Sequence, residues 1–243
     1  MARRALKRVD LEIQDNSLIK INNRKPVSKP PTDIIIYNKV LDAVHQRNPI
    51  LALLLDMLGH TGLRYSDGEF LIKEDFINKD GKFKSSMVII QRKIYSSTLT
   101  RLIKAAKNKK KEFNIKNFEN QARKSAEVEI YISDGMKSIV LDALHFNRNE
   151  KFLFANKHHL SAGWPINIRN ANNILRKVGE ELNVENIRTH SFRKWFANQV
   201  IEAGGTPVIV RDLLGQKSLD TTTLYVSTTI QQRSEVIRKI NNY

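Results

Sequence analysis

The apolar segment that follows Pro49 constrains the fold of this chain more than any other stretch. Residues Ile50–Leu58 are apolar on nearly every side, so a helix here must be buried and other elements must pack around it. Pro49 suits the first position of such a helix, and Gly59 and Gly62 favour a turn after it. The longest unbroken apolar run stops at Asp56 and is far too short to cross a bilayer. The segment therefore predicts a globular domain built around one central helix.

Helical patterns dominate the rest of the chain, and only two short segments resemble strands. Both strand-like segments are rich in β-branched residues, and the second alternates apolar and polar positions. The expected fold class is α+β, mainly α-helical, with a small antiparallel sheet at one side. Strands are predicted over Met87–Ile90 and Val128–Ile132, and helices over 33–46, from Met136, over Ile166–Leu182, over His190–Ala203 and from Pro207 to Gly215.

The charge of the chain indicates a polyanionic partner. The sequence has 41 Lys and Arg residues against 25 Asp and Glu, a net charge of +16, and nucleic acid is the common partner of such a protein. The absence of cysteine excludes disulfides and thiolate metal sites. No apolar stretch follows the basic N-terminus as it would in a signal peptide, so we expect a cytoplasmic protein without a membrane anchor.

Two basic segments stand apart from the predicted core. Residues 1–31 are polar and end in Lys29-Pro30-Pro31, which predicts an arm or linker before a folded domain over 32–243. Residues 95–123 form an insertion between the two strands and carry a basic helix, Leu99–Lys111. This helix either exposes a solvated face or contacts the DNA backbone. The lysines concerned are Lys104, Lys107, Lys109, Lys110 and Lys111.

A set of side chains suited to phosphodiester chemistry is concentrated towards the C-terminus. His190 and Arg193 are three residues apart at a helix start, so they share one helix face, where free amides also favour anions. We expect this face to lie opposite the core-facing aromatic residues of that helix. Arg64 supplies a second guanidinium and Tyr225 a phenol. Together they suit attack on a phosphodiester whose developing charge is held by arginines.

In order and spacing these residues resemble the tyrosine recombinase (phage integrase) family over about residues 32–243. The family's first box is matched by Thr61-Gly-Leu-Arg64-Tyr-Ser66 and its second by His190-Ser-Phe-Arg193. The Leu-Leu-Gly segment is matched at Leu213-Leu214-Gly215, and the nucleophile box at Thr222-Thr-Leu-Tyr225.

The resemblance implies a catalytic role for each matched residue. Tyr225 would attack the scissile phosphate and form a 3′-phosphotyrosyl link, while Arg64 and Arg193 hold the non-bridging oxygens. His190 would accept the tyrosine proton or orient the phosphate. The bond energy stays in the protein–DNA ester, and arginines do the work of a metal, so neither a cofactor nor a metal is expected. A lysine should protonate the leaving 5′-oxygen.

Two lysines compete for that last role, and the chain departs from the family elsewhere as well. Lys93 is expected at the end of the first strand and Lys124 just before the second, and we favour Lys93. Gln216 stands where the family usually has His or Trp, and its amide can donate a hydrogen bond but cannot carry a proton. Only about 31 residues precede the expected catalytic domain, where the family usually has a helical core-binding domain.

The resemblance predicts a site-specific recombinase that integrates or excises a mobile element and acts as a tetramer on two double-stranded DNA duplexes. The C-terminal helix, about Ile230–Ile240, either docks onto a neighbouring subunit or folds back on its own core. Two alternatives remain. The residues 190–214 also fit a helix-turn-helix regulator without catalysis, and the same active site fits strand relaxation alone, as in type IB topoisomerases.

Overall fold

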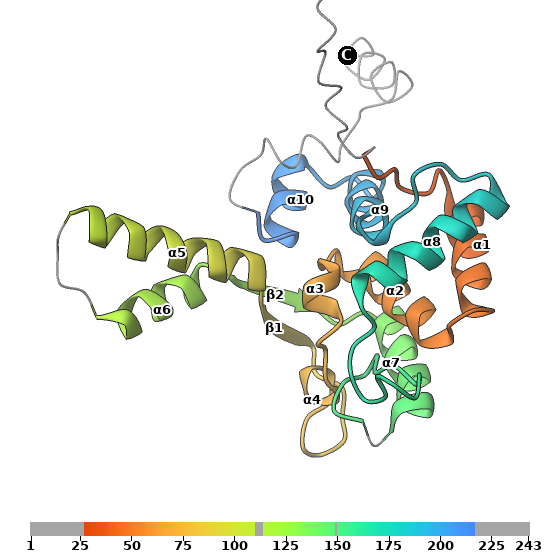
Figure 1. Cartoon of the computed structure of the whole chain (residues 1–243), viewed down its shortest axis with the longest axis horizontal. Helices are drawn as coiled ribbons and strands as arrows, with labels where there is room; N and C mark the ends of the chain where they lie inside the picture. The colour runs from red at the N-terminus through yellow and green to blue at the C-terminus, as the bar shows by residue number, and fades with distance from the viewer. Residues whose placement is uncertain (1–26, 110–113, 149, 217–243) are drawn as a thin grey trace, which may run out of the picture.

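The computed structural model describes residues 27–109, 114–148 and 150–216, and within them it is mainly helical with one small sheet (Figure 1). This confirms the predicted fold class. The elements are α1 (Ile34–His45), α2 (Pro49–Thr61), α3 (Tyr65–Gly68), α4 (Lys73–Phe76), β1 (Ser86–Ile90), α5 (Arg92–Asn108), α6 (Ile115–Lys124), β2 (Glu127–Tyr131), α7 (Asp134–Asn147), α8 (Ile168–Leu182), α9 (Thr189–Glu202) and α10 (Pro207–Leu213).

Helix α2 forms the centre of the domain, as its apolar sequence predicts. It packs against α1, α7 and α9, and most of its side chains are buried. Asn48 caps its start by accepting a hydrogen bond from the Leu51 amide at 2.9 Å. The helix continues through Gly59, where a turn was expected. A Cβ at Gly59 would lie 2.0 Å from the Tyr37 Oη, so this glycine makes room for α1 to approach.

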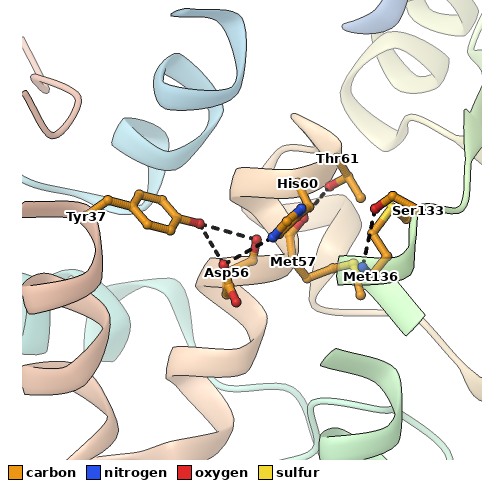
Figure 2. Close-up of polar contacts among 7 residues, drawn as sticks. All are labelled: Tyr37, Asp56, Met57, His60, Thr61, Ser133 and Met136. Carbon is orange, nitrogen blue, oxygen red and sulfur yellow. Dashed lines mark hydrogen bonds and ion pairs between the residues drawn. The ribbon is translucent and has the colours of Figure 1, made fainter. Parts of the chain in front are cut away.

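A polar contact also joins α1 to α2 (Figure 2). The Tyr37 hydroxyl donates to Asp56 Oδ1 at 2.8 Å, and His60 Nε2 lies 3.7 Å from the same oxygen. The Tyr37 ring stacks on Trp195 of α9, with 4.8 Å between the ring centroids. Tyr37 therefore holds α1, α2 and α9 together, and α9 carries two of the predicted catalytic residues.

The two strands pair antiparallel and pack one face on the core. The register places Met87 opposite Ile130 and Ile89 opposite Val128. Met87, Val128 and Ile130 are buried, whereas Val88 faces outward. Period-2 alternation thus gives one apolar face, as predicted for the small sheet.

The insertion between the strands is a helical hairpin that projects from the domain (Figure 1). Its two helices, α5 and α6, pack against each other, with Thr98 and Ala106 of α5 and Ala122 of α6 buried. The basic helix was predicted over Leu99–Lys111, but α5 already begins at Arg92, two residues after the end of β1. As a result Lys93 lies in the first turn of α5 and not at the end of the strand.

The last residues of the predicted arm lie against the domain. The Lys29 amide donates to the Asn186 carbonyl at 3.2 Å, and Lys194 Nζ of α9 donates to the Ser28 carbonyl at 2.6 Å. Residues 1–26 lie outside the described structure. Among the described helices, none is both long and apolar enough to span a membrane.

Candidate active site

The end of α2 determines where Arg64 lies. The Thr61 hydroxyl donates to the Met57 carbonyl at 2.7 Å, and the Gly62 amide donates to the Leu58 carbonyl at 2.9 Å. Gly62 has φ +67°, a left-handed conformation that ends the helix as glycine commonly does. A Cβ there would lie 2.4 Å from Phe196 and 2.6 Å from Leu214. The Thr-Gly pair therefore ends α2 tightly and leaves Arg64, half-buried, at the start of α3.

Helix α9 carries His190 in its first turn and Arg193 one turn later. Its start is secured by Ser191, whose hydroxyl accepts a hydrogen bond from the Arg188 amide at 3.0 Å. Arg193 is only 1% exposed, although the sequence suggested a face turned away from the core. The reason is that α9 is covered on two sides. Phe192 joins the main core, while Phe196 packs into a second small cluster with α10.

The turn after α10 brings the two arginine segments together. Arg193 Nη2 donates to the Leu214 carbonyl at 3.0 Å, and its Nη1 donates to the carbonyl of Gly62. Arg64 Nη1 donates to Gln91 Oε1, and Gln91 Nε2 donates to the same Leu214 carbonyl at 2.8 Å. Gly215 has φ +61° and ends α10. The Leu-Leu-Gly box thus presents one backbone carbonyl on which the two arginine segments converge.

The electrostatics of His190 show which charges lie around it. Its pKa is lowered from 6.5 to about 4, first by burial and then by the positive charges of Arg193, Lys194, Arg64 and Lys93. The imidazole is therefore neutral at pH 7 and is able to accept a proton. The charge of Lys93, at the base of the hairpin, therefore acts on the same imidazole as the charges of the two arginines.

One buried carboxylate balances this cluster of cations. Asp67 lies three residues after Arg64 and accepts a hydrogen bond from the Arg92 amide at 2.9 Å. Burial raises its pKa, while the charges of Arg64, Arg193 and Arg92 oppose that rise. The Arg92 guanidinium lies 3.6 Å from the centroid of the Phe70 ring, a cation–π contact that fixes the start of α5.

The structure gathers most of the described candidates and separates the others. Arg64, His190, Arg193 and Lys93 lie at one place, and Gln216 follows directly after the turn on which the arginines converge. Lys124 ends α6 at the base of the hairpin. The three described lysines of the basic helix are exposed along the hairpin and away from the arginines, namely Lys104, Lys107 and Lys109. Tyr225, Lys110, Lys111 and the predicted helix over 230–240 lie outside the described residues.

Sequence analysis did not single out Gln91, Asp67 or Arg92. Asp67 carried a weak signal, since it lies one helical turn after Arg64. Gln91 carried none, because its partners are 27 and 123 residues away in the sequence. In the described part of the chain, no group of three His, Cys, Asp or Glu side chains is arranged to hold a metal ion.

Known proteins resemble this chain in sequence and in fold. A segment of 64 residues, 26% of this chain, is 39% identical to the tyrosine recombinase XerC of Leptospira interrogans. It covers 20% of that relative, so the chain matches about one fifth of the length of XerC.

Among solved structures, XerA recombinase matches at TM-score 0.58 with 13% identity, covering 89% of this chain and 66% of XerA. The Tn1549 transposon integrase in complex with transposon right end DNA matches at TM-score 0.60 with 12% identity, covering 90% of this chain and 68% of that integrase. XerH bound to palindromic difH substrate matches at TM-score 0.58 with 15% identity, covering 87% and 52%. The sequence model of the phage integrase family matches residues 36–232, which is most of the sequence, and the chain therefore belongs to that family.

Proposed function

We propose that this chain is a site-specific DNA recombinase that cuts and rejoins strands through a covalent link between Tyr225 and a 3′-phosphate. The observation that carries the proposal is the convergence of the Arg64 and Arg193 segments on the Leu214 carbonyl, beside a neutral His190. Two fixed guanidinium groups next to a proton acceptor suit a phosphate whose negative charge grows during attack. The nucleophile box follows this turn in the sequence.

Each step of the proposed reaction balances without a cofactor. The Tyr225 oxygen attacks the phosphorus, the bond from phosphorus to the 5′-oxygen breaks, and an ester to tyrosine forms. His190 accepts the phenolic proton, and a lysine gives a proton to the leaving 5′-oxygen. We assign that lysine as Lys93, because its charge reaches His190, and retain Lys124 as the second candidate. Gln216 would donate an amide hydrogen bond to a phosphate oxygen. Attack by a 5′-hydroxyl on the tyrosyl ester reverses the steps and rejoins the strand.

The α5–α6 hairpin is the proposed contact for the DNA backbone beyond the scissile phosphate. Segment 92–124 holds eleven Lys or Arg residues against two Glu, which is more than half of the net charge of the chain. Five side chains on α5 recur at intervals of three or four residues and so form one stripe opposite the buried face of the helix. This α5 stripe consists of Lys93, Ser97, Thr100, Lys104 and Lys107, and all five are exposed. It begins at the proposed general acid and runs roughly 21 Å outward at the rise of an α-helix.

The proposed partner is double-stranded DNA, with a tetramer of this chain on two duplexes during strand exchange. The net charge of +16 supports the first part of this proposal. The relatives support it as well, since the XerH and Tn1549 integrase structures are described as complexes with DNA. Integration or excision of a mobile element is the proposed biological role, in the cytoplasm.

Covalent capture on DNA tests the proposed chemistry. The probe is a pool of nicked duplex oligonucleotides with a randomised central segment, from which the short strand beyond the nick diffuses away after cleavage. A protein–DNA adduct that survives denaturing electrophoresis is expected with the wild-type chain, and sequencing of the captured strands gives one enriched duplex. Tyr225→Phe should abolish the adduct and retain DNA affinity, whereas Tyr131→Phe, an exposed tyrosine on β2, should leave it unchanged.

Two other results would redirect the proposal. If the wild-type chain forms no adduct, yet repeated rounds of binding select a specific duplex from the same pool, a helix-turn-helix regulator built from α9 and α10 explains the chain better. If an adduct forms and supercoiled plasmid is relaxed, but no strand passes between two duplexes, the activity is that of a type IB topoisomerase.

A further inference from the structure

Gln91 occupies a junction between the projecting hairpin and the cluster of arginines. It follows β1 directly and is the N-cap residue of α5, and its side chain is 1% exposed. Its backbone amide donates to the Ala126 carbonyl at 2.9 Å, and its carbonyl accepts from the Tyr95 amide at 2.9 Å. Both backbone groups are therefore used, and the position of the residue is fixed from β2 and from α5.

The side-chain amide of Gln91 has two partners, one at its oxygen and one at its nitrogen. A guanidinium only donates hydrogen bonds, so Arg64 must face the amide oxygen. A backbone carbonyl only accepts, so Leu214 must face the amide nitrogen, at 2.8 Å. The orientation of the amide follows from these partners alone.

The turn after α10 is shaped to admit this amide. A Cβ on Gly215 would lie 2.5 Å from Gln91 Nε2 and 2.3 Å from Val128, so only glycine leaves the space. The Leu214 carbonyl also accepts a hydrogen bond from Arg193 Nη2 at 3.0 Å. Gln91 thus connects the guanidinium of Arg64 to the same atom that holds Arg193.

We infer that Gln91 is a positioning residue that fixes the Arg64 guanidinium relative to Arg193 for phosphate binding. This inference rests on the proposed function, and it adds a residue that does not itself touch the DNA. Arg64 is half-buried, and without the amide its long side chain has other rotamers available. A displacement of a catalytic group by about 1 Å can cost roughly 10²-fold in rate.

A substitution that keeps the shape of Gln91 and removes both hydrogen bonds tests the inference. Gln91→Met should slow strand cleavage of the enriched duplex in a single turnover by roughly 10²-fold, while DNA affinity stays at the wild-type value. The matched control is Gln121→Met, the same chemical change at an exposed position on α6 of the same hairpin, which should cleave at the wild-type rate. Gln91→Glu keeps an acceptor for Arg64 and loses the donor to Leu214, so it should cleave faster than Gln91→Met and more slowly than wild type.

A second substrate separates positioning from a general loss of structure. In a duplex whose scissile phosphate is replaced by a methylphosphonate, one charged oxygen is absent and less charge needs to be held by the arginines. If Gln91 acts through Arg64, the deficit of Gln91→Met should disappear on this substrate. An equal deficit on both substrates, or wild-type cleavage by Gln91→Met on the phosphate, would overturn the inference. Failure of the wild-type chain to cleave any duplex would overturn the proposed function instead.

Discussion

At the scale of single residues, the neutral His190 makes the stability of the protein depend on pH. Its pKa is about 4 in the folded protein against 6.5 in an ordinary environment. Between these values the unfolded chain binds a proton that the folded protein does not, so the free energy of unfolding falls as pH drops from 6.5 to 4. We predict that His190→Gln loses this dependence, a difference on the order of 2–3 kcal/mol between pH 7 and pH 4. Urea unfolding of both proteins at these two pH values measures it.

Glu69 has the opposite effect on the pH dependence of stability, so the effect of His190 must be measured as a difference between variant and wild type. Burial raises its pKa from 4.5 to about 7, so the folded protein holds a proton there that the unfolded chain releases, and stability falls as pH rises through this window. The pH curve of the wild-type protein therefore contains opposing contributions. The difference between variant and wild type in how the free energy of unfolding changes with pH gives the contribution of His190 alone. The control is His45→Gln, at the exposed end of α1. An identical change with pH in His190→Gln and wild type would contradict the prediction.

Residues in short local patterns could be predicted, and residues that join distant segments could not. Arg64, His190 and Arg193 were predicted from boxes of a few letters, and the structure brings them together. Those boxes also encode their own local structure, since Gly62 and Gly215 end helices in a left-handed conformation. Gln91 is a polar residue after a strand, and only the folded chain places it between Arg64 and Leu214.

At the scale of elements, the α5 stripe should control how DNA affinity depends on salt. Each phosphate neutralised contributes about −0.9 to the slope of log affinity against log salt concentration. Lys104→Gln with Lys107→Gln removes two cations of the stripe and should make the slope shallower by about 1.8. Binding of the enriched duplex, measured by fluorescence anisotropy over a series of salt concentrations, gives the slope.

A control with the same charge change shows whether the location of the cations matters. Lys79 and Lys82 are exposed on the loop after α4, away from the hairpin (Figure 1), so Lys79→Gln with Lys82→Gln should leave the slope unchanged. Equal slopes for the two double variants would exclude the stripe as a backbone contact. Single-turnover cleavage at saturating DNA should be retained by both, because neither pair lies at the arginines.

The elements themselves were predictable where the pattern of apolar residues decides the structure. The central helix, the paired strands and α9 followed from their apolar patterns and caps. The start of α5 did not, because the turn between strand and helix is fixed by contacts with distant residues. The Arg92 amide donates to Asp67 and its guanidinium stacks on Phe70, and neither partner is near in sequence.

At the scale of the whole molecule, the α5–α6 hairpin projects from one side of the domain, and α1, α7 and α8 lie on the opposite side (Figure 1). In the described residues, the base of the hairpin meets the domain at Gln91 and Arg92, next to the arginine cluster. DNA bound along the α5 stripe would therefore lie next to the two arginines that we propose as catalytic.

Assembly of several copies on DNA should depend on the C-terminal segment, residues 230–243. The C-terminal segment has a helical apolar pattern, Val236, Ile237 and Ile240, which suits docking onto a neighbouring subunit. Deletion of residues 230–243 should then weaken the pairing of two duplexes far more than binding to a single duplex, because single-site binding depends on the basic surface of one copy. Native gel electrophoresis with duplexes of two lengths resolves the two complexes. Replacement of the three apolar residues by serine provides the control with the chain length kept. If both variants lose single-duplex binding and pairing to the same extent, the segment packs on its own domain, and the tetramer must be held by another surface.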